Sequence, residues 1–96
     1  MNRLVLAASL VERAALRYTP AGLPALDSSL RHESEVSEDG RPRKVSLEIR
    51  AVAIGAVTRS LLALELGAPA LFIGFLAPSR NKRGLLFHIT SVEPAA

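Results

Sequence analysis

The cationic side chains of this 96-residue sequence gather in two short stretches, and their chemistry is the most distinctive in the chain. The stretches comprise Arg41, Arg43 and Lys44, and then Arg80, Lys82 and Arg83. A guanidinium group has a planar fork of donors that meets two phosphate oxygens at once, and its flat face can stack on a nucleobase. The two clusters therefore indicate a surface that binds a polyanion. The alternative is two solvated loops with scattered charge.

Residues with catalytic or metal-binding chemistry do not form a recognisable pattern. The two histidines, His32 and His88, are far apart, and no H-x-x-x-H spacing is present. His32 adjoins Glu33, but neighbours on a strand point to opposite faces and cannot easily form a relay. No serine lies in a G-x-S-x-G motif, and no glycine-rich phosphate loop is present. We expect no enzyme activity, no metal and no cofactor, and we interpret both histidines as structural.

The composition sets the class of protein. Ninety-six residues predict a single domain over 1–96, and the 49% hydrophobic content is enough for one core. The absence of cysteine suits a reducing compartment, so we expect a cytoplasmic protein. The apolar run 4–11 resembles a short signal peptide, but Glu12 and Arg13 interrupt it. The uncharged run 66–79 is broken by glycine and proline and is too short to cross a membrane.

A half-buried strand at the middle of the chain organises the predicted fold. From Lys44 to Ile54, Val45, Leu47 and Ile49 alternate with polar residues, which is typical of a strand with one covered face. The other expected elements are strands over 2–10, 25–35, 70–77 and 85–93, a turn over 18–22, a mobile polar loop over 35–43, a short helix over 56–66, and a basic hairpin loop over 78–84.

Some boundaries stay open. Residues 10–16 could continue the first strand or begin a bend, and 62–66 would also serve as a strand. Gly74 indicates a bulge or a sharp bend within its strand. Five strands with a helix between the third and the fourth are the element order of an all-β oligonucleotide/oligosaccharide-binding barrel, the OB-fold. That closed barrel is the fold class we predict.

Several stretches of the sequence resemble a known family. Asn2–Leu6 and Leu16–Pro24 resemble the opening of bacterial single-stranded-DNA-binding proteins, and more closely that of their short relatives, the primosomal replication protein N group. Ser29–Ser34, Leu66–Ala77 and Leu86–Ile89 are similar to its second, fourth and last strands. The resemblance covers nearly the whole chain. It implies a homodimeric barrel that binds single-stranded DNA during replication restart, beside the primosomal helicase PriA.

The sequence also departs from the better-known members of that family. They carry one aromatic residue on the exposed face of the central strand and another in the loop before it, where this chain has Ser46 and Arg41. A basic residue of the second strand corresponds to Glu33. Tyr18 is then the best candidate for stacking, whereas Phe72 is expected in the core, Phe75 in the core or at a subunit contact, and either Phe87 or His88 at the surface.

These observations together predict a nucleic-acid-binding surface made by both basic loops, facing one groove, and continued along the strands. Its residues are Arg17, Tyr18, Arg31, Arg41, Arg43, Lys44, Arg50, Arg80, Lys82 and Arg83. With few aromatics, binding must depend on phosphates, so three to five contacts predict a log–log salt slope of about −2 to −3.5.

A second hypothesis is a protein-interaction adaptor on the same barrel, with only weak DNA binding. The acidic run at Glu33, Glu35, Glu38 and Asp39 favours it, because such a run could dock a basic partner; a plain solvated loop is the alternative. A homodimer is expected on physical grounds too, since an apolar first strand at a sheet edge invites pairing.

Overall fold

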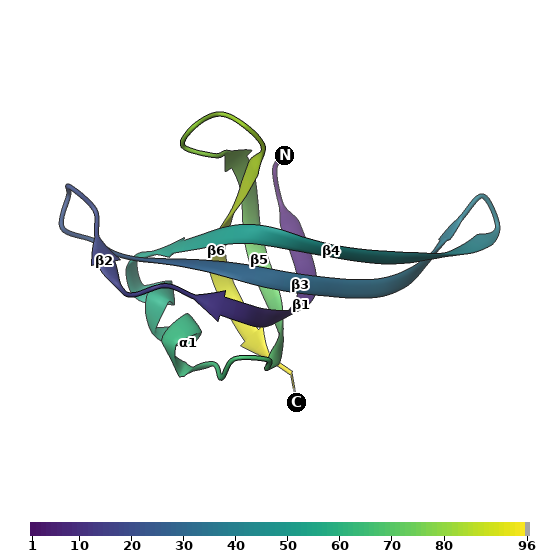
Figure 1. Cartoon of the computed structure of the whole chain (residues 1–96), viewed down its shortest axis with the longest axis horizontal. Helices are drawn as coiled ribbons and strands as arrows, with labels where there is room; N and C mark the ends of the chain where they lie inside the picture. The colour runs from purple at the N-terminus through teal and green to yellow at the C-terminus, as the bar shows by residue number, and fades with distance from the viewer. Residues whose placement is uncertain (96) are drawn as a thin grey trace.

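The computed structural model describes residues 1–95, and Figure 1 shows a small barrel from which one long hairpin projects. The strands are β1 (Leu4–Arg13), β2 (Arg17–Tyr18), β3 (Pro24–Glu38), β4 (Arg41–Ile54), β5 (Pro69–Pro78) and β6 (Leu85–Pro94). A 3-10 turn (Gly55–Val57) leads into helix α1 (Thr58–Ala63) between β4 and β5.

The sheet closes on itself because β1 pairs with two partners. The strand order is β1-β5-β6-β4-β3-β2, and β1 also pairs with β3, which joins the two ends of the sheet. All neighbours are antiparallel except β4 and β6, which run parallel. Apart from the two-residue β2, this is a closed barrel of five strands with a short helix between the third and the fourth long strands. The predicted OB-fold is confirmed.

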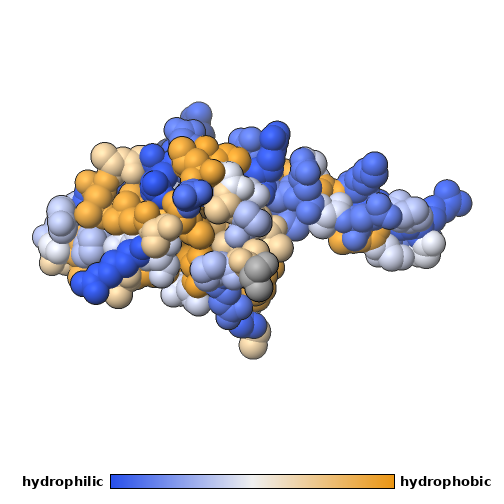
Figure 2. Space-filling model, turned by 90° about the horizontal axis from the view of Figure 1, so that it is seen from below, coloured by the Kyte–Doolittle hydropathy of each residue, from blue (hydrophilic) through white to orange (hydrophobic). Residues whose placement is uncertain are grey.

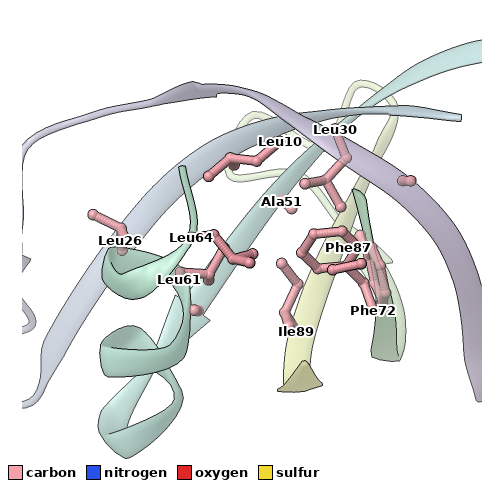
Figure 3. Close-up of a cluster of buried hydrophobic side chains, with 12 residues drawn as sticks. Leu10, Leu26, Leu30, Ala51, Leu61, Leu64, Phe72, Phe87 and Ile89 are labelled. Carbon is pink, nitrogen blue, oxygen red and sulfur yellow. The ribbon is translucent and has the colours of Figure 1, made fainter. Parts of the chain in front are cut away.

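The core fills the barrel with side chains from every long strand and from α1 (Figure 3). Phe72, Phe87 and Leu30 are fully buried, and Leu61 of α1 closes one end. Two residues of β4 that point into the barrel, Ala51 and Ala53, are small. Their size lets Phe72 and Phe87 fit inside a narrow barrel. Phe72 therefore lies in the core as predicted.

The predicted mobile loop over 35–43 is wrong, because these residues continue the β3–β4 ladder. The pairing extends from Ala25 opposite Ile54 to Glu38 opposite Arg41. Only Asp39 and Gly40 remain for the turn, and both have positive φ, 51° and 73°. Asp-Gly suits the two-residue type I′ turn, whose twist matches that of the strands. We call the part of this hairpin from residue 33 to residue 48 the arm; it lies along the 49 Å longest dimension of the molecule (Figure 1).

The helix forms where it was predicted, but it is shorter than 56–66, and the strand alternative for 62–66 is wrong. Leu64 is extended, with φ −78° and ψ 139°, so the helix ends at Ala63. Arg13 of β1 donates from Nη1 to the Leu61 and Leu64 carbonyl oxygens at 2.8 and 2.6 Å. A cation at the carboxyl end of the helix satisfies carbonyls that have no partner within it.

Two irregularities shape the strands. The open stretch 10–16 continues β1 as far as Arg13, with a register shift between Leu10 and Glu12. The predicted irregularity at Gly74 is confirmed by a register shift between Ile73 and Gly74. A Cβ atom at Gly74 would overlap the His88 carbonyl oxygen of β6, so only glycine permits this close approach of the two strands.

His32 lies where β3 separates from β1. The β1–β3 ladder stops at Ser9 opposite Arg31. Beyond this pair the His32 ring links the two strands. Its Nδ1 lies 2.6 Å from the Ala7 carbonyl oxygen and its Nε2 lies 2.8 Å from Ser34 Oγ. Because the carbonyl can only accept, Nδ1 carries the proton in this arrangement. His32 therefore joins two strands, which agrees with its interpretation as a structural histidine.

Candidate nucleic-acid interface

A groove of about 940 Å³ lies on the outer face of β3, β4 and β6. The turn after β2 and the loop between β5 and β6 form its rims. Its charged lining residues are Arg17, Asp27, Arg50, Arg80 and Arg83. Four arginines and one carboxylate give this groove a formal charge of +3. We call it the basic groove.

Internal hydrogen bonds hold the β5–β6 loop in a defined conformation. Ser79 N–H donates to the Gly84 carbonyl at 3.1 Å, and Lys82 N–H donates to the Ser79 carbonyl at 2.7 Å. Asn81 Oδ1 accepts from Arg83 N–H at 2.9 Å. Small polar side chains and the backbone thus satisfy one another. Within residues 1–95, Arg80, Lys82 and Arg83 form no ion pair, so their charge is available to a ligand.

Among the residues that the structure describes, Arg17 is the groove cation that has an ion-pair partner. Its Nε and Nη2 atoms donate to the two carboxylate oxygens of Asp27 at 2.7 and 3.1 Å. This hydrogen bonding lowers the pKa of Asp27, helped by attraction from Arg50 and Arg80, whereas partial burial acts in the opposite direction. The same bond and the attraction of the carboxylate raise the pKa of Arg17. A phosphate that binds Arg17 must therefore compete with Asp27.

The arm carries the other basic cluster, and the structure does not bring it to the groove. Arg41, Arg43 and Lys44 are absent from the groove lining, and Figure 1 shows the arm tip far from the β5–β6 loop. Arg43 pairs with Glu38 at 3.1 Å, and Lys44 lies opposite Glu35. The expectation that both basic loops face one groove is therefore not met within this chain.

The arm as a whole is acidic. Between residues 33 and 48 there are five carboxylates and three cations, a formal charge of −2. Figure 2 shows the arm as a mainly hydrophilic projection beside a body with several hydrophobic patches. The carboxylates of the arm thus neutralise its cations, whereas the cations of the β5–β6 loop are not neutralised in this way.

Arg31 and Tyr18 lie beside the groove rather than in it. Arg31 is on the same face of β3 as Asp27, but it sits 3.8 Å from Glu48 and lines a smaller hollow of about 420 Å³ with Glu33 and Glu93. Tyr18 is 67% exposed and follows Arg17 on β2. Tyr18 is thus accessible, but it is absent from the groove lining, which includes its neighbours Arg17 and Thr19.

Sequence reasoning missed the aromatic pair of the groove wall. Phe75 and His88 lie opposite each other on β5 and β6, with ring centroids 4.8 Å apart and planes 8° from parallel. His88 lines the groove, and Phe75 is 37% exposed, whereas Phe87 is buried. The alternation in β6 left either residue 87 or residue 88 for the surface, and only the bulge at Gly74 sets the pairing of His88 with Phe75.

Other kinds of site find little support in the part of the chain that the structure describes. No group of three or more histidine, cysteine, aspartate or glutamate side chains there is arranged to hold a metal ion. Within residues 1–95, no helix is long and apolar enough to cross a membrane.

Comparison with known proteins gives this groove a context. Residues 2–91 match a family described as "Another single-strand binding protein family". Replication restart protein PriB of Bordetella pertussis is 52% identical over 81 residues, covering 84% of this chain and 76% of the relative. PriB of Neisseria gonorrhoeae is 42% identical over 86 residues, covering 88% and 84%.

Solved structures agree with the sequence matches. PriB from Ralstonia solanacearum superposes with a TM-score of 0.92 at 35% identity and covers 100% of this chain and 99% of its own. The single-stranded DNA binding protein from Thermus aquaticus has a TM-score of 0.76 at 26% identity and covers 100% of this chain but 50% of its own. By fold and by family match, the chain is an OB-fold domain of the single-strand binding type. It belongs to the PriB family of replication restart proteins.

Proposed function

We propose that this protein binds single-stranded DNA through the basic groove and acts as an accessory protein of replication restart in the cytoplasm. The observation that carries the proposal is the groove itself, which has four arginines on the outer face of an OB-fold barrel. A cationic groove that follows the backbone is the usual way in which proteins bind single strands without sequence preference. Membership of the PriB family supports the same role.

The proposed contacts fall into three groups. Arg50, Arg80 and Arg83 bind phosphates in the groove, Lys82 binds them from the adjoining β5–β6 loop, and Arg17 joins these residues when Asp27 releases it. Arg31 and Tyr18 extend the path beside the groove, through charge and stacking respectively. The arm cations Arg41, Arg43 and Lys44 make weaker contacts with a strand that has left the groove. Because phosphates dominate, we expect little preference for sequence.

A homodimer is also proposed, and the first strand supports it. Within residues 1–95, residues 4–8 of β1 form ladder pairs with β5 alone, because the ladder with β3 begins at Ser9. One edge of β1 is therefore open, except where His32 Nδ1 contacts the Ala7 carbonyl oxygen. Val5 beside that edge is 44% exposed. An open apolar edge is a template for pairing with a second strand, here β1 of another copy. Light scattering at micromolar concentration should give the mass of two chains, and a strict monomer would refute the dimer.

A protein-interaction adaptor is the second candidate, because the arm has a net negative charge and no place in the groove. In the first candidate the protein stabilises the primosomal helicase PriA on DNA. In the second it docks PriA and other primosome proteins, and its own DNA binding is only weak. An acidic projection suits a basic partner surface.

One triple variant separates the two candidates. Arg80→Glu, Lys82→Glu and Arg83→Glu together reverse the charge of the β5–β6 loop. Loss of oligonucleotide binding with PriA binding intact supports the DNA-binding function. If the variant lost PriA binding and kept its affinity for DNA, the adaptor would replace it. Labelled-oligonucleotide anisotropy and a PriA pull-down give the two readouts.

A further inference from the structure

A row of four residues crosses the floor of the basic groove and points to a specific ligand. The pairings place Asp27 of β3 opposite Val52 of β4, Val52 opposite His88 of β6, and His88 opposite Phe75 of β5. Directly opposed residues share one face of a sheet, so the four side chains stand in line on the outer face. Three of them, Asp27, Val52 and His88, line the groove.

The geometry of the aromatic pair fixes the orientation of His88. The ring centroids are 4.8 Å apart and the planes are 8° from parallel. This separation equals the distance of about 4.8 Å between neighbouring strands, so the two rings stand upright on the sheet like adjacent plates. One face of His88 is against Phe75. Its other face is therefore turned toward β4, above Val52.

A base that stacks on the free face of His88 would lie over Val52. Val52 is only 3% exposed, so neighbouring side chains now cover it, and a base must displace them to reach this apolar floor. His88 and Asp27 are two strand spacings apart, about 9–10 Å. A flat ring in van der Waals contact on both faces needs about 7–8 Å. On the far side, the Asp27 side chain bounds the groove.

We propose that this space is a nucleobase-binding site, in which a base stacks on the free face of His88. Phe75 supports the imidazole from behind, and Arg50 and Arg80 hold the flanking phosphates. The proposal rests on the proposed function and adds to it a residue that supplies the stacking absent from the central strand, where Ser46 is found. The imidazole is stacked on Phe75 before binding, so little of its own conformational freedom is lost when a base binds.

A single-tryptophan variant tests the site directly, because the natural sequence contains no tryptophan. In His88→Trp the indole takes the position of the imidazole, and a dT20 oligonucleotide should quench its fluorescence by stacking. Leu62→Trp is the matched control: Leu62 is 46% exposed on α1 and outside the groove, so its emission should not change. Equal responses of the two variants would overturn the proposal.

Affinity provides a second readout that separates stacking from charge. His88→Ala should weaken dT20 binding by roughly 5- to 150-fold at every salt concentration while the salt slope stays unchanged, because stacking involves no counterion release. An oligomer of abasic deoxyribose phosphates should bind the unaltered protein and His88→Ala equally.

The possible failures are distinguishable. If the unaltered protein binds dT20 but His88→Ala binds it equally well, the base site is wrong and the DNA-binding groove stands. If the unaltered protein does not bind dT20 at low salt, the proposed function fails and the base site fails with it.

Discussion

The basic groove and the arm have similar numbers of cations, yet the structure gives them opposite electrostatic characters. In the groove, four arginines face a single carboxylate, and the adjoining loop uses serine, asparagine and backbone groups for its internal bonds. In the arm, three cations face five carboxylates, and one of the pairs is a direct ion pair at 3.1 Å. The number of basic residues in a stretch is thus a poor guide to a phosphate site; their unpaired charge is a better one.

The two regions differ in packing as well as in charge. The groove is the outer surface of a sheet whose inner face covers the whole core, whereas the arm projects beyond β1 and has no layer against either face. The groove residues are therefore held by the barrel. The arm depends on its own ladder and its two-residue turn.

The largest expected effect is on stability. Phe72→Ala should lower the free energy of unfolding by about 3–5 kcal/mol, because it leaves a cavity under the groove. Val36 of the arm is 44% exposed, so Val36→Ala should change the free energy of unfolding by no more than about 0.5 kcal/mol. Urea unfolding followed by circular dichroism measures both. Similar losses in the two variants would mean that the arm is packed in solution.

Charge reversal is the next largest effect. Reversal of Arg80, Lys82 and Arg83 should weaken binding to an oligonucleotide at least about 100-fold at low salt and flatten the salt slope by about 2, since about three phosphate contacts are lost. The matched reversal of Arg41, Arg43 and Lys44 should cost less than about threefold, because the arm is acidic overall and Arg43 is already paired with Glu38. If the arm variant lost more affinity than the loop variant, the contrast between the two regions would be reversed.

A smaller effect, of opposite sign, is expected at Asp27. Asp27→Asn removes the carboxylate that competes for Arg17, so affinity should rise by about 3- to 10-fold and the salt slope should steepen by about 0.7, one additional phosphate. Glu65→Gln is the control and should leave affinity unchanged, because Glu65 is exposed, follows α1 and lies outside the groove. Unchanged affinity in Asp27→Asn would show that Arg17 does not contact DNA.

The smallest effect concerns the pH dependence of stability. Because Arg17 lowers the pKa of Asp27 in the folded protein below the ordinary value of 3.8, the unfolded chain binds more protons as pH falls through this range. The stabilisation by the pair is therefore full above the ordinary pKa and is lost as pH falls through the lowered one. Asp27→Asn should remove this part of the acid dependence in thermal unfolding measured between neutral pH and about pH 2. An identical acid profile in both proteins would contradict it.

The sequence predicted the fold better than the site, and the reason is physical. The alternation of apolar and polar residues in β4 and the irregularity at Gly74 depend on local sterics, so both could be predicted from neighbouring residues. The arm could not be recognised in the same way, because a hairpin exposed on both faces needs no apolar stripe; only Asp39-Gly40 marked it, and the polar composition around that turn suggested a loop. Which residues lie together in the site also depends on the pairing of strands that are distant in the sequence.

Three long-range contacts changed the interpretation of site residues. The pairing of Arg17 with Asp27 links positions ten apart, and the Phe75–His88 stack and the separation of the two basic clusters follow from the barrel topology. None of these can be obtained from spacing along the chain. All ten predicted contact residues lie at the surface or at its edge, yet only Arg17, Arg50, Arg80 and Arg83 line one groove. Whether these four, and the others, bind DNA stays a prediction.

The most direct test of this account is a fluorescence titration of the unaltered protein with a labelled single-stranded oligonucleotide at two ionic strengths. Binding through three to five phosphates predicts affinity that falls with salt, with a log–log slope of about −2 to −3.5. An affinity that does not change with salt would contradict binding by the arginines of the groove.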